Sequence, residues 1–363
     1  MKIEEQMTKL LPFMVHHRRE LHKIPELLYQ EFKTSEYLQK ALTELGYGFK
    51  RVDTGLVVNI KGTAPKRTVG FRADMDGLEI KEATGVSYKS QHPGRMHACG
   101  HDGHMAMLLG FAKYLKENPP KDNVVLVFQP AEEGGLGAKV MIDSGFVDAD
   151  VFYAVHLMPW IEVGKFASRA GEMLAGAESF DVEFLGRGRH CMFHDGKDDA
   201  ILAAARFIND AEGLNSERFI FNIGAISGGT IMNAVAEKVV VKGTMRFFSL
   251  DDLNAAYKVL KGVIDDIEKQ GIGKVKIVPT EKRYLPLINT PSEVEKLAKI
   301  EGFIEDKKVF GAEDFSLFLD KFGGVFINLG CKIKDGQTLH SDKFNFDENA
   351  MVVGVQLYKT LLG

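Results

Sequence analysis

Cysteine is scarce in this chain of 363 residues, which contains only Cys99, Cys191 and Cys331. Such a small, odd number excludes a disulfide framework and favours a reducing compartment, so we expect a cytoplasmic protein. The chain also has no strong excess of charge of either sign. Its 46 basic and 50 acidic residues give a net charge of −4, and there is no long basic run. We therefore expect neither nucleic acid nor an anionic membrane as a partner.

Long apolar segments are absent as well. The apolar run Leu10–Val15 contains Pro12 and ends in His16-His17-Arg18-Arg19, which fits neither a signal peptide nor a membrane span. The chain is nevertheless longer than the usual single hydrophobic core, so we expect two domains.

Short, almost continuously apolar runs alternate with segments of helical periodicity in both outer parts of the chain. They predict an α/β fold whose mostly parallel sheet is buried on both faces. Because the carboxyl ends of parallel strands meet at one edge, the polar residues that follow these strands are expected to share a crevice. These residues are Asp74, Asp76, Glu132, Glu133 and His156. The predicted strands are 55–62, 68–73, 123–128, 151–155 and 324–329, and the predicted helices are 3–45 (interrupted at Pro25-Glu26), 105–115 and 349–362.

Between these parts, from Ser179 to Thr280, the pattern changes to β-α-β-β-α-β, the order of a ferredoxin-like α+β domain. Strands are expected at 179–185, 218–226, 238–247 and 274–278, and helices at 200–212 and 250–270. We therefore divide the chain into 1–176, an inserted domain at 177–284, and 285–363.

The stretch His97–His104 holds three His, one Cys and one Asp within eight residues. A single His or Cys is most often a packing residue, but this density of soft and borderline ligands predicts a metal site. The apolar run Met105–Leu115 predicts a helix, so residues 101–104 are expected in the loop before it. Positive partial charge at the helix start favours a thiolate at Cys99 and a carboxylate cap at Asp102.

Two adjacent glutamates follow the predicted strand 123–128. Turn-forming residues at 129–130 and 134–135 bracket Glu132 and Glu133, so one carboxylate can bind a metal while its neighbour serves as a base. Solvation at a turn is the alternative role of such a pair. The complete set of candidate ligands is Cys99, His101, Glu133, His156 and His340.

Five ligand side chains exceed what one catalytic zinc ion with an open position takes. Two divalent ions roughly 3.5 to 4 Å apart would use all five and leave room for a bridging water. Glu132 can deprotonate that water, which then attacks a polarised carbonyl. The predicted reaction is hydrolysis of an amide or peptide bond. Cys and His ligands permit zinc, whereas paired carboxylate and His ligands often hold manganese; cobalt and nickel are further candidates.

Short motifs follow one another along nearly the whole chain, beginning at Arg18–His22 and Pro25–Leu27. They are FRADMDGL at 71–78, HACGHDGH at 97–104, QPAEEG at 129–134, VH at 155–156, GAEDF at 311–315 and LHS at 339–341. This ordered set resembles the di-metal amidohydrolase branch of the aminoacylase/carboxypeptidase superfamily. That branch includes indole-acetyl-amino-acid hydrolases, hippurate hydrolases and N-acetyldiaminopimelate deacetylases.

The resemblance implies a catalytic domain split in sequence around a lid domain, through which such enzymes form homodimers. It implies two divalent metal ions per subunit, held by the five candidate ligands, and a small N-acyl amino acid as substrate. Catalysis falls to Glu132. In the lid, His190 and Asn233 would polarise the substrate carbonyl or hold its carboxylate. Arg246 would also contact the substrate, and a surface charge on its strand is the alternative role for this residue.

The remaining acidic and histidine residues of these motifs take supporting roles under the same resemblance. Asp74, Asp76 and Asp102 are expected to orient the ligands from behind. His97 and His104 are expected to pack against the site and bind no metal.

The chain departs from the family pattern near His190. Gly-Gly-His followed by a Pro-His pair is usual there, but residues 188–195 read GRHCMFHD, and Glu79 stands where the family has proline. Three hypotheses therefore stay open. The first is an amidohydrolase of N-acyl amino acids, nearest to N-acetyldiaminopimelate deacetylases. The second is a dipeptidase or carboxypeptidase on the same fold, and the third is a metal-binding protein whose lid has lost catalytic function.

Overall fold

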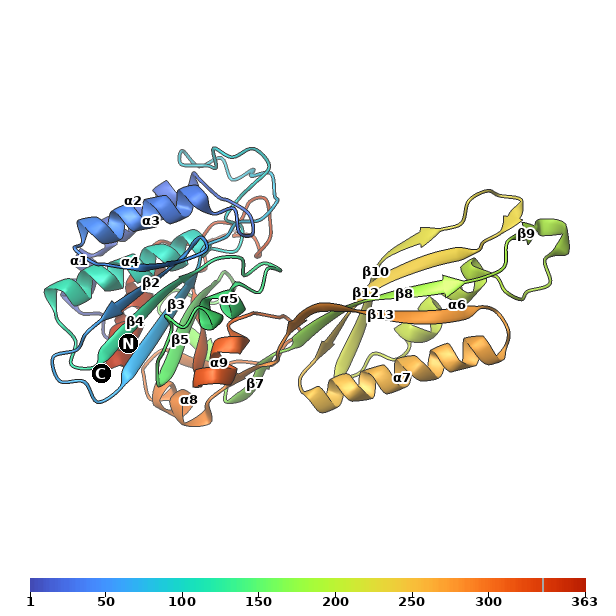
Figure 1. Ribbon diagram of the computed structural model, residues 1–363. Helices are drawn as coiled ribbons and strands as arrows, with labels where there is room; N and C mark the ends of the chain where they lie inside the picture. The colour runs from blue at the N-terminus through green and yellow to red at the C-terminus, as the bar shows by residue number, and fades with distance from the viewer. Residues whose placement is uncertain (335) are drawn as a thin grey trace. The chain divides into compact units, whose positions relative to one another are not determined.

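The computed structural model describes residues 1–334 and 336–363, except for the side chains of residues 279–282. The chain forms two compact units, each with its own hydrophobic core. The larger unit contains residues 1–173, 288–307 and 314–363, and the inserted unit contains residues 174–287 and 308–313 (Figure 1).

An eight-stranded sheet forms the centre of the larger unit. Its strands are β1 (Lys50–Val52), β2 (Gly55–Ile60), β3 (Thr68–Asp74), β4 (Asn123–Gln129), β5 (Val151–Met158), β6 (Phe166–Ser168), β15 (Phe303–Glu305) and β16 (Gly324–Gly330). They lie in the order β1-β2-β4-β3-β5-β16-β6-β15. The central strands β4, β3, β5 and β16 are mutually parallel, whereas β2 is antiparallel to β4 and β6 is antiparallel to β16. The predicted α/β class with a mostly parallel sheet is therefore confirmed.

Helices cover both faces of this sheet, which explains why every residue of β5 is buried. On one face, the ring of Phe71 in β3 packs against Phe111 of α4 (His101–Glu117) and Tyr358 of α10 (Ala350–Leu362), at 4.9 and 5.1 Å between centroids. On the other face, Phe152 of β5 packs against Phe318 of α9 (Ser316–Phe322) at 4.8 Å. The remaining helices of this unit are α1 (Glu5–Lys9), α2 (Leu11–His22), α3 (Phe32–Glu44), α5 (Gly137–Asp143) and α8 (Pro291–Ala298).

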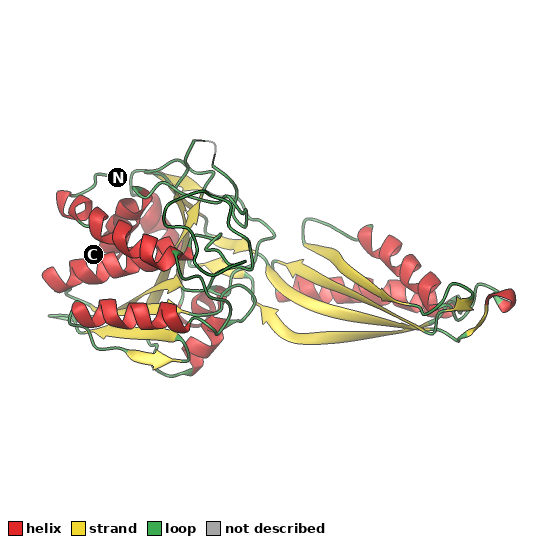
Figure 2. Ribbon diagram, turned by 90° about the horizontal axis from the view of Figure 1, so that it is seen from above, coloured by secondary structure: helices red, strands yellow, loops and turns green. Residues whose placement is uncertain are grey.

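The inserted unit has the predicted β-α-β-β-α-β order. Its elements are β8 (Gly176–Leu185), α6 (Ala200–Glu212), β10 (Phe219–Gly228), β12 (Lys238–Phe247), α7 (Leu250–Lys269) and β13 (Lys274–Tyr284). The strands form an antiparallel sheet in the order β10-β12-β8-β13, with both helices along one face (Figure 2). The short strands β9 (Arg189–His190) and β11 (Ala234–Val235) form a separate pair, as do β7 (Gly171–Leu174) and β14 (Leu287–Asn289).

Two predicted boundaries near the candidate site are wrong. Helix α4 begins at His101, so residues 101–104 form its first turn and do not lie in a preceding loop. Gly100, with φ of +86°, makes the turn that allows the helix to begin at His101. Strand β5 continues to Met158, so His156 lies within the strand and not beyond its end. Among the residues that the structure describes, no helix has the length and apolar character that crossing a bilayer requires.

Candidate metal centre

Asp76 orients the two adjacent glutamates. It follows β3, whereas Glu132 and Glu133 follow the neighbouring parallel strand β4. The Asp76 carboxylate accepts the backbone N–H of Glu132 at 3.1 Å and that of Glu133 at 3.0 Å. The preceding residue, Ala131, has φ of +53°, a conformation that costs a non-glycine residue roughly 1–2 kcal/mol. The pair therefore projects from a strained turn that Asp76 holds by two hydrogen bonds.

His101 presents one ring nitrogen to the centre of the site. Its Nδ1–H donates to the backbone carbonyl of Asp76 at 2.8 Å, and its Nε2 is buried without a hydrogen-bond partner among the described residues. Burial lowers the pKa of His101, but the carboxylates of Asp74 and Asp76 outweigh it and raise the pKa to about 10. The surroundings of His101 thus stabilise positive charge, and its Nε2 would point towards a bound metal ion.

Cys99 and His156 lie opposite each other, with 3.4 Å between Sγ and Nε2. Burial raises the pKa of Cys99 well above its usual range, and the charges of Glu133, Glu132 and Asp74 add to the effect. The expectation that the helix start favours a thiolate at Cys99 is therefore wrong for the chain by itself. Burial, followed by the charge of His104, holds the pKa of His156 well below its usual value. Its imidazole is therefore neutral, the form that binds metals.

His340 reaches the site from the C-terminal part of the chain. Its Nε2 lies 3.2 Å from Oε1 of Glu133, and its backbone N–H donates to the carbonyl of Ala98 at 2.9 Å. The side chain keeps 51% of its surface exposed, so this ligand faces the open side of the site.

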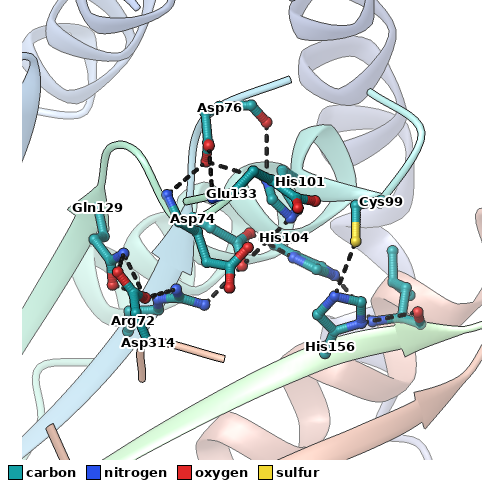
Figure 3. Close-up of polar contacts among 12 residues, drawn as sticks. Arg72, Asp74, Asp76, Cys99, His101, His104, Gln129, Glu133, His156 and Asp314 are labelled. Atoms are coloured by element: carbon teal, nitrogen blue, oxygen red, sulfur yellow. Dashed lines mark hydrogen bonds and ion pairs between the residues drawn. The ribbon is translucent and has the colours of Figure 1, made fainter. Parts of the chain in front are cut away.

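All five predicted ligands and Glu132 come together in the larger unit. Figure 3 shows four of the ligands, Cys99, His101, Glu133 and His156. The donor atoms of the five ligands and Glu132 form overlapping groups in which all atoms lie within 4.8 Å of one another, among them Cys99, His101 and His156; Cys99, Glu133 and His340; and His101, Glu132 and Glu133. Thiol, imidazole and carboxylate donors of this kind suit borderline divalent ions. The shared members and the partnerless Nε2 of His101 fit a pair of adjacent ions.

His104, three residues after His101, has both ring nitrogens occupied. Nδ1–H donates to Asp74 Oδ1 at 2.6 Å, and Nε2 accepts the backbone N–H of Leu157 at 2.9 Å. Burial raises the pKa of Asp74, but its neighbours His101, His104 and Arg72 outweigh it and hold the pKa well below its usual range. His104 therefore links β3 to β5 behind the ligands.

A buried hydrogen-bond network that the sequence did not predict lies next to Asp74. Arg72 donates to Asp74 at 2.6 Å, to Asp314 at 3.0 Å and to Gln129 at 2.8 Å. Gln129 also donates to both Asp314 oxygens, and Asp314 accepts the N–H of Ala138. The network fixes both ends of the loop that carries Glu132. One signal was present, since Arg72 is a charge within an otherwise apolar strand.

Asp102 does not cap α4, which corrects the predicted cap. The N-cap residue is Gly100, and no side chain caps the helix. Asp102 Oδ2 instead accepts hydrogen bonds from Arg18 and His22, each at 2.9 Å. Although burial raises the pKa of Asp102, these two cations hold it far below its usual range. Asp102 thus ties the first turn of α4 to α2, and neither of these hydrogen bonds involves one of the five ligands.

The predicted lid residues belong to the inserted unit and form two groups there. His190 pairs with Ala234 across β9 and β11, and the carbonyl of Asn233 accepts the N–H of Cys191 at 2.9 Å. The His190 Nδ1 accepts the N–H of Met192, which leaves Nε2–H as its donor. Arg246 lies at the opposite end of β12, roughly 25 Å along the strand from Lys238. Because Asn233 precedes the first residue of β12 by only five positions, the His190–Asn233 pair and Arg246 lie towards opposite ends of that strand.

The unusual Arg189 builds the loop beside His190. Its guanidinium donates to the carbonyls of Phe193, Arg187 and Lys197 and pairs with Asp195. The arginine that replaces the family's glycine thus holds the loop together through its side chain.

A family model described as peptidase family M20/M25/M40 matches residues 70–363. N-acetyldiaminopimelate deacetylase from Leuconostoc mesenteroides is 34% identical over 373 residues, covering 95% of each chain. The enzyme of the same name from Geobacillus sp. WCH70 is 34% identical over 367 residues, covering 96% of each. A crystal structure of a dinuclear metal binding peptidase from Bacillus subtilis superposes with a TM-score of 0.86 at 27% identity, covering 98% of each chain.

Proposed function

The chain belongs to peptidase family M20/M25/M40 and is a hydrolytic enzyme acting on amides, and we propose that it removes the acyl group from N-acyl amino acids. N-acetyldiaminopimelate is the first candidate substrate, because relatives that match most of this chain carry that activity in their names. The observation that carries the proposal is the convergence of Glu132 with five metal-binding side chains at one edge of the sheet.

We propose that Cys99, His101, Glu133, His156 and His340 hold two divalent ions, either manganese or zinc, with cobalt and nickel as further candidates. When bound, such ions polarise a scissile carbonyl and lower the pKa of water in the site. Elemental analysis of protein purified without chelators identifies the metal and its stoichiometry. Fewer than two ions per chain after metal supplementation would contradict the paired arrangement.

Glu132 acts as the general base in this proposal. Its side chain is 7% exposed, and the Asp76 hydrogen bonds to its own N–H and that of Glu133 fix the backbone that carries it. The carboxylate takes a proton from the attacking water and delivers it to the departing amine, a role worth roughly 10²–10⁴-fold in rate.

The inserted unit supplies the substrate contacts, and we propose that they assemble in a homodimer. Because Arg246 and the His190–Asn233 pair lie at opposite ends of the unit, a second copy is needed to bring both to one substrate. Burial lowers the pKa of Arg246, and a substrate carboxylate would compensate that cost. Apolar side chains near His190 support an interface there, since Met192, Phe193, Ile231 and Met232 are 73, 62, 61 and 98% exposed.

Light scattering on purified protein tests the dimer, and a Met232→Asp variant should shift it towards monomers. A monomer for the unmodified chain at working concentration would contradict this arrangement.

We keep the division at 177–284 for the lid as part of the proposal. We also keep the cytoplasmic location, which Cys99, Cys191 and Cys331 support as free thiols.

A metal-supplemented assay over N-acetyl, N-benzoyl and dipeptide substrates tests the activity. Turnover of N-acyl amino acids with a free carboxylate is expected, and N-acetyldiaminopimelate should give the highest kcat/KM. Preference for dipeptides would favour the peptidase alternative. No turnover at full metal occupancy would favour the metal-binding protein with an impaired lid.

A further inference from the structure

Glu31 is a fully buried carboxyl group that the proposed reaction does not use. It directly precedes α3, and its Oε2 accepts the hydroxyl of Thr54 at 2.7 Å. Its Oε1 accepts the backbone N–H of Ala131 at 2.9 Å. Burial raises the pKa of Glu31 to about 7, against the opposing effect of the hydrogen bond from Thr54. A buried carboxyl group is costly, so its contacts indicate what it does.

The contact at Ala131 lies one residue before Glu132. Ala131 has φ of +53°, and its carbonyl accepts the N–H groups of Gly135 and Gly137 at 3.2 and 3.1 Å. Its own N–H is buried and is bound by Glu31. Removing that acceptor would leave a buried donor unpaired and favour relaxation of Ala131 to a right-handed conformation. Such a change would rotate the backbone that carries Glu132.

The same loop is held from a second point on the segment that contains Glu31. The hydroxyl of Tyr29 donates to the carbonyl of Gly135 at 2.7 Å. Residues 29–31 therefore hold the loop on both sides of the glutamate pair, while the Asp76 carboxylate binds the pair itself. The backbone around Glu132 is thus fixed from two distant parts of the chain, residues 29–31 and Asp76.

We propose that Glu31 is a positioning residue for the general base, acting on Glu132 through the backbone of Ala131. The inference rests on the proposed role of Glu132. Glu31 accepts hydrogen bonds from Ala131 and Thr54. An amide in its place keeps both contacts, because its oxygen can accept from the N–H of Ala131 while its nitrogen donates to the Thr54 hydroxyl oxygen.

Three variants test the proposal: Glu31→Ala, Glu31→Gln and the matched control Glu26→Ala. Glu26 is also buried, and its carboxylate accepts the N–H groups of Lys33 and Thr34 at the start of α3, away from Ala131. Glu31→Ala should lower kcat by roughly 10–100-fold, with KM within about threefold and metal content unchanged. Glu31→Gln should stay within about threefold of the unmodified enzyme. A small effect of Glu31→Ala, or equal losses in Glu31→Gln or Glu26→Ala, would overturn the proposal.

Hydrogen exchange gives a readout that needs no substrate. The amides of residues 131–133 should exchange faster in Glu31→Ala, but not in Glu31→Gln or Glu26→Ala. Unchanged exchange in Glu31→Ala would overturn the proposal. If instead Glu132→Gln kept full activity, the base assignment would fail while the exchange result still reported how Glu31 holds the loop.

Thr54→Val keeps the proposal testable if Glu31→Ala does not fold. The variant removes one of the two hydrogen bonds to the carboxyl group and preserves the side-chain shape. We expect kcat to fall about threefold to tenfold at unchanged KM. An unchanged kcat in Thr54→Val would contradict the proposal.

Discussion

At the scale of the residue, the partners of each ring nitrogen decide what a histidine can do. His101 and His104 lie on the same turn of α4, yet of these two only His101 keeps a buried nitrogen that makes no hydrogen bond with the described residues. In His104, both ring nitrogens form hydrogen bonds, one with Asp74 and the other with Leu157. A proposed metal ligand and a packing residue thus lie three positions apart in the same helix, and the difference comes from the strands opposite them.

His101→Ala should remove at least half of the bound metal, because the partnerless nitrogen is lost while the packing histidine stays. Elemental analysis after gel filtration measures this loss. His92→Ala is the matched control, since His92 bonds to the carbonyl of Pro25 in the same unit and should leave the metal content unchanged. Full metal content in His101→Ala would remove His101 from the ligand set.

His17 predicts a pH dependence of stability. Burial, followed by the charge of His16, lowers the pKa of His17 to about 4 in the folded chain, against an ordinary value of 6.5. Between these values the unfolded chain binds a proton that the folded chain does not, so the free energy of unfolding falls as pH falls from 6.5 to 4. Denaturant titrations of His17→Gln should show a weaker fall than the unmodified chain. An identical pH profile would exclude His17 as its source.

At the scale of the element, helix α7 of the inserted unit carries an avoidable glycine. Gly262 lies in the middle of the helix with an exposed surface, and an added Cβ would meet no heavy atom within 4 Å. Gly262→Ala should therefore raise the free energy of unfolding by roughly 0.5–1 kcal/mol, since alanine loses less backbone entropy. Denaturant unfolding measures the change, and kcat should stay the same. Destabilisation would show that the helix is not regular at this position.

Gly137, the first residue of α5, gives the opposite expectation. A Cβ there would lie 1.6 Å from the carbonyl oxygen of Pro130, within the loop that carries Glu132. Gly137→Ala should lower both the free energy of unfolding and kcat, because the backbone atom cannot move aside without shifting the loop. Thermal unfolding and an activity assay check both effects. An unchanged thermal stability and an unchanged kcat in Gly137→Ala would contradict the close approach of Gly137 to the Pro130 carbonyl.

Periodicity predicted most elements, because apolar strands and amphipathic helices carry their burial pattern in the sequence. It placed the start of α4 too late, since the polar first turn from His101 to His104 carries no apolar signal. It also missed contacts between distant segments. The bonds of Asp76 to the N–H groups of Glu132 and Glu133, and of Glu31 to Ala131, involve backbone atoms that no residue type reveals. The candidate ligands could be proposed from the sequence because the side chains of Cys, His and Glu are potential metal donors in any surroundings.

At the scale of the whole molecule, each unit has its own apolar core. Phe71, Phe111 and Tyr358 belong to the core of the larger unit, whereas Phe184 and Phe207 pack at 5.3 Å in the inserted unit. All five candidate ligands belong to the larger unit. Metal binding should therefore stabilise only that unit, by mass action on its folded form.

Calorimetry checks this expectation. We expect two unfolding transitions, of which a chelator lowers one and leaves the other in place. The transition that stays should be the one that Gly262→Ala raises. A single transition that moves as a whole on chelation would show that the two units unfold together.

The most direct measurement is turnover of N-acetyldiaminopimelate by the metal-loaded chain, compared with its Glu132→Gln variant at equal metal content. We predict metal-dependent release of acetate by the unmodified chain. In the variant, we predict a loss of kcat of roughly 10²–10⁴-fold or more with the metal retained. Near-normal turnover by Glu132→Gln with its full complement of metal would contradict the assignment of Glu132 as the base.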